Sequence, residues 1–174
     1  MQPAAVQFII REEQAADREG IRQVHRLAFK TDDEGALVDR LRADGLVVVS
    51  MVAEIAGNVV GHILFSRLPI ETQSGMVQAI ALAPVAVKPS FQLKGIGSSL
   101  IRRGLALCRD RAVRIVLVVG HPDYYPRFGF SAETAKRLKS SFSGPMFMAL
   151  ELVPGALDGI VGTVRYPTAF DTMQ

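Results

Sequence analysis

Hydrophobic spacing near the start of the chain predicts one strand and two helices. The apolar run over residues 6–11 is typical of a strand. Apolar residues then recur three and four positions apart after Asp17, a residue type that often begins helices, and again over residues 34–43, where Gly45 follows. The two stripes are Ile21, Val24, His25 and Ala28, and Leu37, Val38 and Leu41. Each stripe predicts a helix with one buried face.

A β-hairpin and a parallel strand–helix–strand unit are predicted for the middle of the chain. Two valine-rich segments, 46–55 and 59–68, flank the turn signal Gly57-Asn58. The run over 115–119 is apolar without alternation, as in a strand buried on both faces. The other expected elements are a loop at 69–75, a strand at 76–87, a helix at 94–111, and C-terminal strands at 147–152 and 163–166. This order predicts an α/β fold with a mixed central sheet.

Composition is consistent with one globular domain over residues 1–174. Hydrophobic residues make up 49% of the chain and charged residues 21%, and the net charge is +3. The basic groups are Arg102, Arg103, Arg109, Arg111 and Arg114, and Lys136, Arg137 and Lys139. They favour a solvated surface, with a nearby phosphate-bearing ligand as the alternative. Aromatic residues do not alternate with them, so no nucleic-acid surface is expected.

The sequence carries no sign of export or of a membrane span. The N-terminal MQPAAVQFIIREE lacks a basic segment before its short apolar stretch, and no apolar run approaches the roughly 20 residues of a membrane helix. Cys108 is the only cysteine, and its place in a helical stripe predicts a packing role. We therefore expect a cytoplasmic protein without a membrane partner. No residues have metal-ligand spacing, so no metal is expected.

The segment FQLKGIGSSLIRRG, residues 91–104, places Gly95 and Gly97 where a helix is expected to begin. It is not a Walker A loop, because Lys94 precedes the glycine, and it lacks the third glycine of a dinucleotide fingerprint. The first turn of a helix nevertheless attracts anions, and glycines allow an anion to approach the backbone. At this point an anion site and a helix start with glycines for packing remain equal alternatives.

The wider context resembles a known family. VKPSFQLKGIGSSL resembles the acyl-CoA-binding motif of the GCN5-related N-acetyltransferase (GNAT) superfamily, in which a strand and a proline precede Gln/Arg-x-x-Gly-x-Gly/Ala at a helix start. ALAPVAVKP, GHPDYYPRFGF and MALELVPGAL are similar to its YhbS-like subgroup of predicted bacterial acetyltransferases. The resemblance covers nearly the whole chain. It implies a mixed, splayed central sheet flanked by helices on both faces.

The resemblance implies a binding site for acetyl-CoA, as a co-substrate, around the glycine loop. The diphosphate would lie on the N–H groups of residues 93–98, and Lys94 would add positive charge. Pro84 lies inside an expected central strand, where it cannot donate a ladder hydrogen bond, so a bulge is expected there. In the family the strand splays at this bulge, and the pantetheine arm pairs with the freed backbone. The implied binding residues are Val85, Ala86, Val87, Gln92, Leu93, Lys94, Gly95, Ile96, Gly97 and Ser98.

Tyr125 lies four residues before Gly129-Phe130, where family members often carry a tyrosine. The implied role is general acid toward the departing CoA thiolate, and the alternative is a packing residue. With ordinary pKa values of about 10 for tyrosine and about 8.5 for a thiol, full proton transfer is uphill by roughly 2 kcal/mol. Tyr124 is expected as a wall of the cleft.

The general base is left open by the sequence. Many relatives carry a glutamate before the Val-x-Pro segment, but residues 78–83 (QAIALA) contain no carboxylate. The candidates are Asp33, Glu34, Glu71 and His121, each with a structural role as its alternative, and a chain of water molecules is a further option. His25 and His62 are expected as helix-face and strand residues.

The function implied by the resemblance is transfer of an acetyl group from acetyl-CoA to a primary amine by direct aminolysis. The acceptor would be a small molecule or a peptide, and a homodimer is left open. Two alternatives remain at this point. One is a GNAT-fold module that binds acyl-CoA without turnover, and the other is a basic interaction protein with a purely structural glycine loop.

Overall fold

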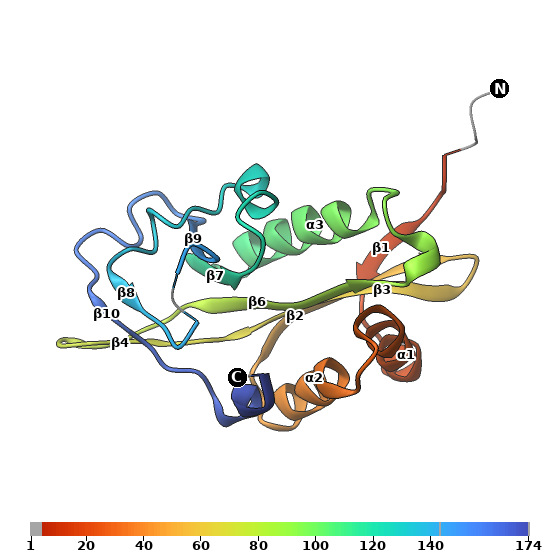
Figure 1. Cartoon of the computed structure of the whole chain (residues 1–174), viewed down its shortest axis with the longest axis horizontal. Helices are drawn as coiled ribbons and strands as arrows, with labels where there is room; N and C mark the ends of the chain where they lie inside the picture. The colour runs from red at the N-terminus through yellow and green to blue at the C-terminus, as the bar shows by residue number, and fades with distance from the viewer. Residues whose placement is uncertain (1–4, 143, 174) are drawn as a thin grey trace.

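A six-stranded mixed sheet forms the centre of the protein, with helices on both faces (Figure 1). The computed structural model describes residues 5–142 and 144–173. The strand order is β1-β2-β3-β6-β7-β9, and only β6 and β7 pair in parallel. The strands are β1 (Ile9–Glu12), β2 (Val47–Ile55), β3 (Asn58–Arg67), β6 (Ile80–Val87), β7 (Ile115–Val119) and β9 (Phe147–Glu151). The predicted hairpin, crossover unit and mixed sheet are confirmed.

The helices cover the sheet in two layers. On one face lies α3, and on the other lie α1, α2 and the C-terminal 3₁₀ helix η4 (Figure 1). Their bounds are α1 (Arg18–Phe29), α2 (Asp33–Ala43), α3 (Ile96–Asp110) and η4 (Thr168–Met173), with shorter 3₁₀ turns η1 (Ala15–Asp17), η2 (Pro89–Phe91) and η3 (Tyr125–Phe128). None of the helices formed by the described residues is long and apolar enough to cross a membrane.

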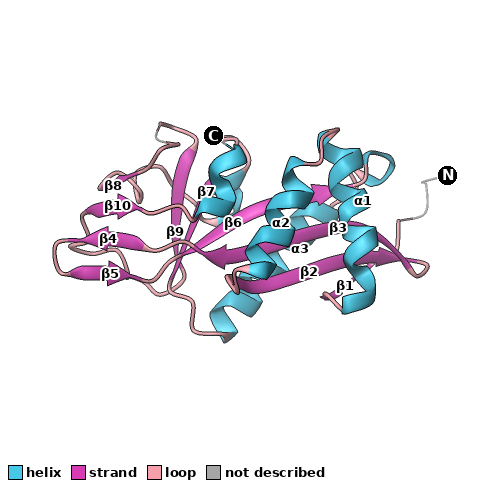
Figure 2. Ribbon diagram, turned by 90° about the horizontal axis from the view of Figure 1, so that it is seen from below, coloured by secondary structure: helices cyan, strands magenta, loops and turns pink. Residues whose placement is uncertain are grey.

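A second, small sheet lies at one end of the molecule (Figure 2). Its strand order is β5-β4-β10-β8. The strands are β4 (Ile70–Thr72), β5 (Gly75–Val77), β8 (Leu138–Lys139) and β10 (Gly162–Val164). The prediction of a loop at 69–75 is therefore wrong, and the strand expected at 76–87 is divided between β5 and β6. Ile70 is fully buried and pairs with Val164. Ile70 also pairs with Val77 of β5, so a short local hairpin and this partner, far away in sequence, together hold the segment extended.

Packing of α3 confirms the stripe expected for it. Leu100, Ile101, Leu105 and Cys108 are buried against the sheet. A Cβ on Gly104 would overlap the ring of Phe65, so a glycine is required for the helix to approach the sheet this closely. Burial raises the pKa of the Cys108 thiol to about 12, which keeps it protonated. Cys108 is thus a packing residue, as predicted.

The strand β6 carries the bulge expected at Pro84. Ile63 of β3 is opposite Val85 and Phe65 is opposite Leu82, so β6 holds one more residue than β3 between these two pairs. Pairing of β6 with β7 covers only Ile80 and Ala81. Beyond Ala81 the two parallel strands diverge, as the resemblance implied. This divergence creates the space in which the candidate site lies.

Candidate active site

A groove of about 490 Å³ runs between the end of β6 and the start of α3. Nine of the ten residues expected to bind the donor line it: Val85, Ala86, Val87, Gln92, Leu93, Gly95, Ile96, Gly97 and Ser98. The tenth, Lys94, is exposed and lies outside the described lining. Nine predicted residues thus share one groove, and Lys94 is not among the residues that line it.

Local backbone geometry builds the loop between β6 and α3. The Gln92 side chain donates a hydrogen bond from Nε2 to the carbonyl oxygen of Val87, at 2.9 Å. Leu93 and Gly95 adopt left-handed conformations, with φ of 62° and 83°. The first backbone hydrogen bond of α3 runs from Ser99 N to Gly95 O. The N–H groups of the first helical turn therefore have no acceptor within the helix, which makes this end of α3 attractive to an anion.

Gly97 keeps the groove open. A Cβ at this position would lie 3.7 Å from the Tyr124 hydroxyl and 3.8 Å from Val87 Cγ2, and both residues line the groove. A side chain there would fit the protein but enter the space where a ligand would lie. Tyr124 forms one wall, as expected, and its hydroxyl is 3.2 Å from Ser98 Oγ.

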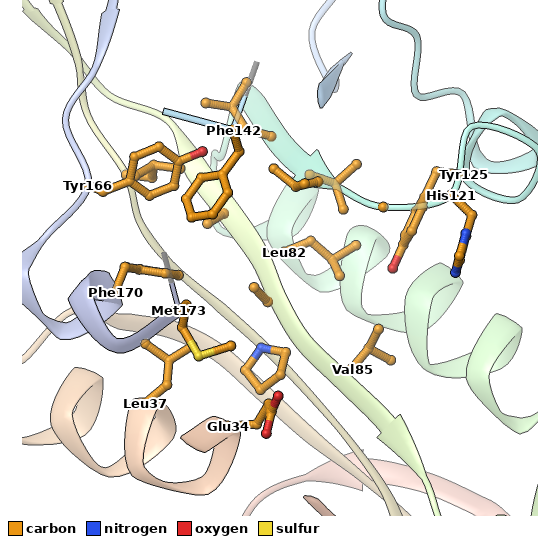
Figure 3. Close-up of a pocket in the computed structure, with 18 of the residues that line it drawn as sticks. Glu34, Leu37, Leu82, Val85, His121, Tyr125, Phe142, Tyr166, Phe170 and Met173 are labelled. Atoms are coloured by element: carbon orange, nitrogen blue, oxygen red, sulfur yellow. The ribbon is translucent and has the colours of Figure 1, made fainter. Parts of the chain in front are cut away.

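A second cavity, of about 360 Å³, occupies the divergence of β6 and β7 (Figure 3). It shares Phe29, Val85 and His121 with the groove. The two spaces therefore adjoin each other at these three residues.

Tyr125 lines the cavity beside His121, one of the three shared residues (Figure 3). Its ring lies against Gly120, where a Cβ would overlap it, and packs edge-on against Phe130 at 5.8 Å between ring centroids. Figure 3 shows the hydroxyl directed toward Val85 and beside His121. Only 8% of Tyr125 is exposed, and burial raises the pKa of its hydroxyl to about 12. The ring is a packing group, and the hydroxyl remains protonated and available as a donor.

Residues 9–132 match the family model described as "Acetyltransferase (GNAT) domain". The chain belongs to the GNAT acetyltransferase family. It is 32% identical to the uncharacterized N-acetyltransferase YhbS of Escherichia coli strain K12 over 167 residues, which are 94% of this chain and 99% of YhbS. The predicted family and the YhbS-like resemblance are confirmed.

Two solved GNAT structures share the fold. That of Escherichia coli YhbS in complex with CoA has a TM-score of 0.87 and 31% identity, covering 98% of this chain and 96% of that chain. That of a GNAT family acetyltransferase from Brucella melitensis in complex with acetyl-CoA has a TM-score of 0.80 and 37% identity, covering 95% and 99%. The splayed sheet described above is thus the GNAT fold.

The structure divides the four base candidates into two groups. Glu34 and His121 line the cavity, and His121 also lines the groove. Asp33 lies outside the described lining of either space. Glu71 forms an ion pair with Arg165 in the second sheet. Of the four candidates, only Glu34 and His121 thus line the cavity.

His25 and His62 form a buried pair that is not part of the described lining of either space. His25 Nε2 lies 2.8 Å from His62 Nδ1, and His62 Nε2 lies 2.8 Å from Ser50 Oγ. Burial lowers the pKa of His25 to about 4 and that of His62 well below its usual range, with the charge of Arg42 adding to both shifts. Both imidazoles are therefore neutral at pH 7. Among residues 5–142 and 144–173, no group of three or more His, Cys, Asp or Glu is placed to hold a metal ion.

The C-terminal wall of the cavity was missed by the sequence reasoning. Phe142, Tyr166, Phe170 and Met173 line the cavity, and all lie C-terminal to the glycine loop and to Tyr125. Phe142 and Tyr166 come from two separate loops, and Phe170 and Met173 come from η4, which packs beside α2 (Figure 1). The cluster of aromatic residues in the tail YPTAFDTMQ was the available signal, but its location depends on the tertiary fold.

Proposed function

We propose that the protein transfers an acetyl group from acetyl-CoA to a primary amine by direct aminolysis. One observation carries this proposal. A groove lined by the expected donor-binding residues adjoins a separate cavity at Val85, beside Tyr125 and His121. Two substrates held in these spaces would meet with their reacting groups side by side. Holding both in one orientation is the main contribution of such an enzyme.

The donor would be held mainly by backbone groups. The free N–H groups at the start of α3 suit the diphosphate of acetyl-CoA. Because β7 pairs only with Ile80 and Ala81, the β7-facing backbone groups of residues 85–87 are left for the pantetheine arm. That arm would carry the thioester along β6 toward Tyr125. A backbone N–H of this segment would stabilise the oxyanion that forms at the carbonyl.

The chemical step joins the amine to the acetyl carbon. The amine nitrogen attacks the thioester carbonyl, the C–N bond forms, and the C–S bond then breaks with CoA leaving as thiolate. The amine loses one proton, which we assign to the imidazole of His121 because this residue lines both spaces. The hydroxyl of Tyr125 would donate a hydrogen bond to the sulfur as negative charge develops on it.

The acceptor amine would be one that is partly neutral near pH 7 to 8. No carboxylate of β6 is available to remove its proton, since that strand reads IALAPVAV. An α-amine has a pKa near 8 and a lysine side chain a pKa near 10.4, so far more of the α-amine is already deprotonated. A panel in which only lysine side chains react would contradict this preference.

Two measurements test the proposal. Thermal unfolding with and without acetyl-CoA should show stabilisation by the ligand. Release of free thiol from acetyl-CoA should then depend on added amine, and His121→Gln should lower it more for amines of high pKa than for amines of low pKa. Stabilisation without amine-dependent thiol release would indicate a binding module without turnover. Absence of stabilisation by acetyl-CoA would indicate that the glycine loop is purely structural.

A further inference from the structure

The cavity beside Tyr125 is apolar over most of its wall. Only four of its nineteen described lining residues carry a polar side-chain group: Glu34, His121, Tyr125 and Tyr166. The Tyr166 hydroxyl is already engaged, at 2.9 Å from Ser140 Oγ. The polar side chains left for a ligand are thus His121 and Tyr125 at the reacting end and the carboxylate of Glu34.

Several elements supply the apolar wall, among them the diverging strands and η4. Leu82, Pro84 and Leu117 come from the diverging strands, while Phe170 and Met173 come from η4. Figure 3 shows Phe142, Phe170 and Met173 on the side of the cavity away from Tyr125 and His121. A ligand with its amine at the reacting end would therefore place the rest of its structure against these side chains. At about 360 Å³ the cavity is at the small end of ligand sites.

The ionised lining of the cavity is acidic, because Glu34 contributes a carboxylate. Glu34, in the first turn of α2, is the only carboxylate among the described lining residues, and no lysine or arginine lines the space. Its Oε2 accepts a hydrogen bond from Thr31 Oγ1 at 2.9 Å. A ligand carboxylate placed here would lose water without gaining a cationic partner, and it would lie near a like charge.

From these walls and this charge we infer the acceptor class. The acceptor is a small primary amine whose remaining part is aromatic or branched aliphatic and carries no carboxylate. The inference rests on the proposed function, since it assigns the cavity to the acceptor. Burial of the apolar part against η4 supplies affinity, and Glu34 excludes acidic amines such as free amino acids.

Matched amines test the two parts of the inference. Phenylalaninamide and alaninamide share the same amine chemistry and differ in the apolar part. We expect kcat/KM to be about 10- to 100-fold higher for phenylalaninamide. Phenylalanine has a carboxylate in place of the carboxamide of phenylalaninamide. Its kcat/KM, expressed per concentration of neutral amine, should be at least about tenfold below that of phenylalaninamide. Spermidine serves as a polar amine and should be a poor acceptor.

Variants connect these preferences to particular side chains. Met173→Ala should lower the phenylalaninamide-to-alaninamide ratio by about threefold or more, while Met76→Ala, at an exposed position on β5, should leave it unchanged. Glu34→Gln should raise kcat/KM for phenylalanine and not for phenylalaninamide. Asp33 lies in the same helical turn as Glu34 but outside the described lining of the cavity, so Asp33→Asn should have no such effect.

The outcomes separate this inference from the proposed function. A transferase that shows equal rates with alaninamide and phenylalaninamide, or that prefers spermidine, overturns the apolar acceptor and leaves the transferase in place. No turnover with any amine overturns the proposed function. In that case calorimetric titration of phenylalaninamide into the CoA-saturated protein still tests the cavity. Binding weakened by Met173→Ala but not by Met76→Ala supports it, and absence of binding overturns it.

Discussion

Replacing Tyr125 with phenylalanine removes one oxygen from the cavity wall beside His121. The ring contacts with Gly120 and Phe130 do not involve this oxygen, so the variant should fold and still bind acetyl-CoA. The effect should appear in turnover. Its size depends on whether the hydroxyl gives up its proton or only donates a hydrogen bond.

Burial decides between these two roles. It raises the pKa of Tyr125 to about 12, whereas a thiol has an ordinary pKa of about 8.5. Complete proton transfer to the thiolate would be uphill by about 3.5 pKa units, or about 5 kcal/mol. A hydrogen bond donated to a charged group stabilises it by about 1.5 to 3 kcal/mol. We therefore expect Tyr125→Phe to lower kcat by about 10- to 150-fold, and to change KM for acetyl-CoA by less than about twofold.

The raised pKa also changes the expected pH profile. With an ordinary tyrosine pKa of about 10, the wild type would lose turnover as pH approaches 10. A folded-state pKa of about 12 moves this loss beyond the range in which the assay is practical. Steady-state kcat should therefore be measured from pH 7 to 10 with a good acceptor for both the wild type and Tyr125→Phe. We expect no alkaline decrease from ionisation of Tyr125 in the wild type, so the two pH profiles should have the same shape.

Tyr166→Phe is the matched control. Tyr166 is also a buried tyrosine of the cavity wall, but its hydroxyl is bonded to Ser140 at the far side of the cavity from Tyr125 (Figure 3). Tyr166→Phe should lower kcat less than Tyr125→Phe does. Equal turnover of wild type and Tyr125→Phe would show that Tyr125 only packs. A wild-type alkaline decrease below pH 10 that is lost in the variant would refute the argument from burial.

Two further predictions concern the groove and the buried histidines. Gly97→Ala has room within the protein, so calorimetric titration should show weaker acetyl-CoA binding with little change in the free energy of unfolding; unchanged affinity would place the diphosphate elsewhere. His25 has a folded pKa of about 4 against an unfolded value of about 6.5, so its stabilising contribution is present above pH 6.5 and is lost as pH falls toward 4. Urea unfolding should show a loss of about 2 kcal/mol from this group between pH 7 and 5, before the carboxylates titrate, with His62 adding in the same direction. A free energy of unfolding that is constant between these two pH values would contradict the burial of the pair.

The sequence by itself determined the elements whose cause is local. The hairpin of β2 and β3 follows from two valine-rich segments around Gly57-Asn58, and α3 follows from the stripe that includes Leu100 and Cys108. Pro84 revealed the bulge, because the missing N–H is a property of that residue alone. Gly95 and Gly97 marked the start of α3 in the same way, and their resemblance to a family motif pointed to the groove.

Only the tertiary structure decided the features that depend on distant partners. The β4–β5 hairpin is local, but its place in a four-stranded sheet depends on the pairing of Ile70 with Val164, and no periodicity near residue 70 records that partner. The wall formed by Phe170 and Met173 likewise exists only because η4 packs beside α2. The pKa of Tyr125 is set by burial among groups from several elements, so the residue was visible in the sequence but its chemical strength was not. Residue type and local spacing are written in the chain, whereas burial and the proximity of distant side chains are properties of the folded molecule.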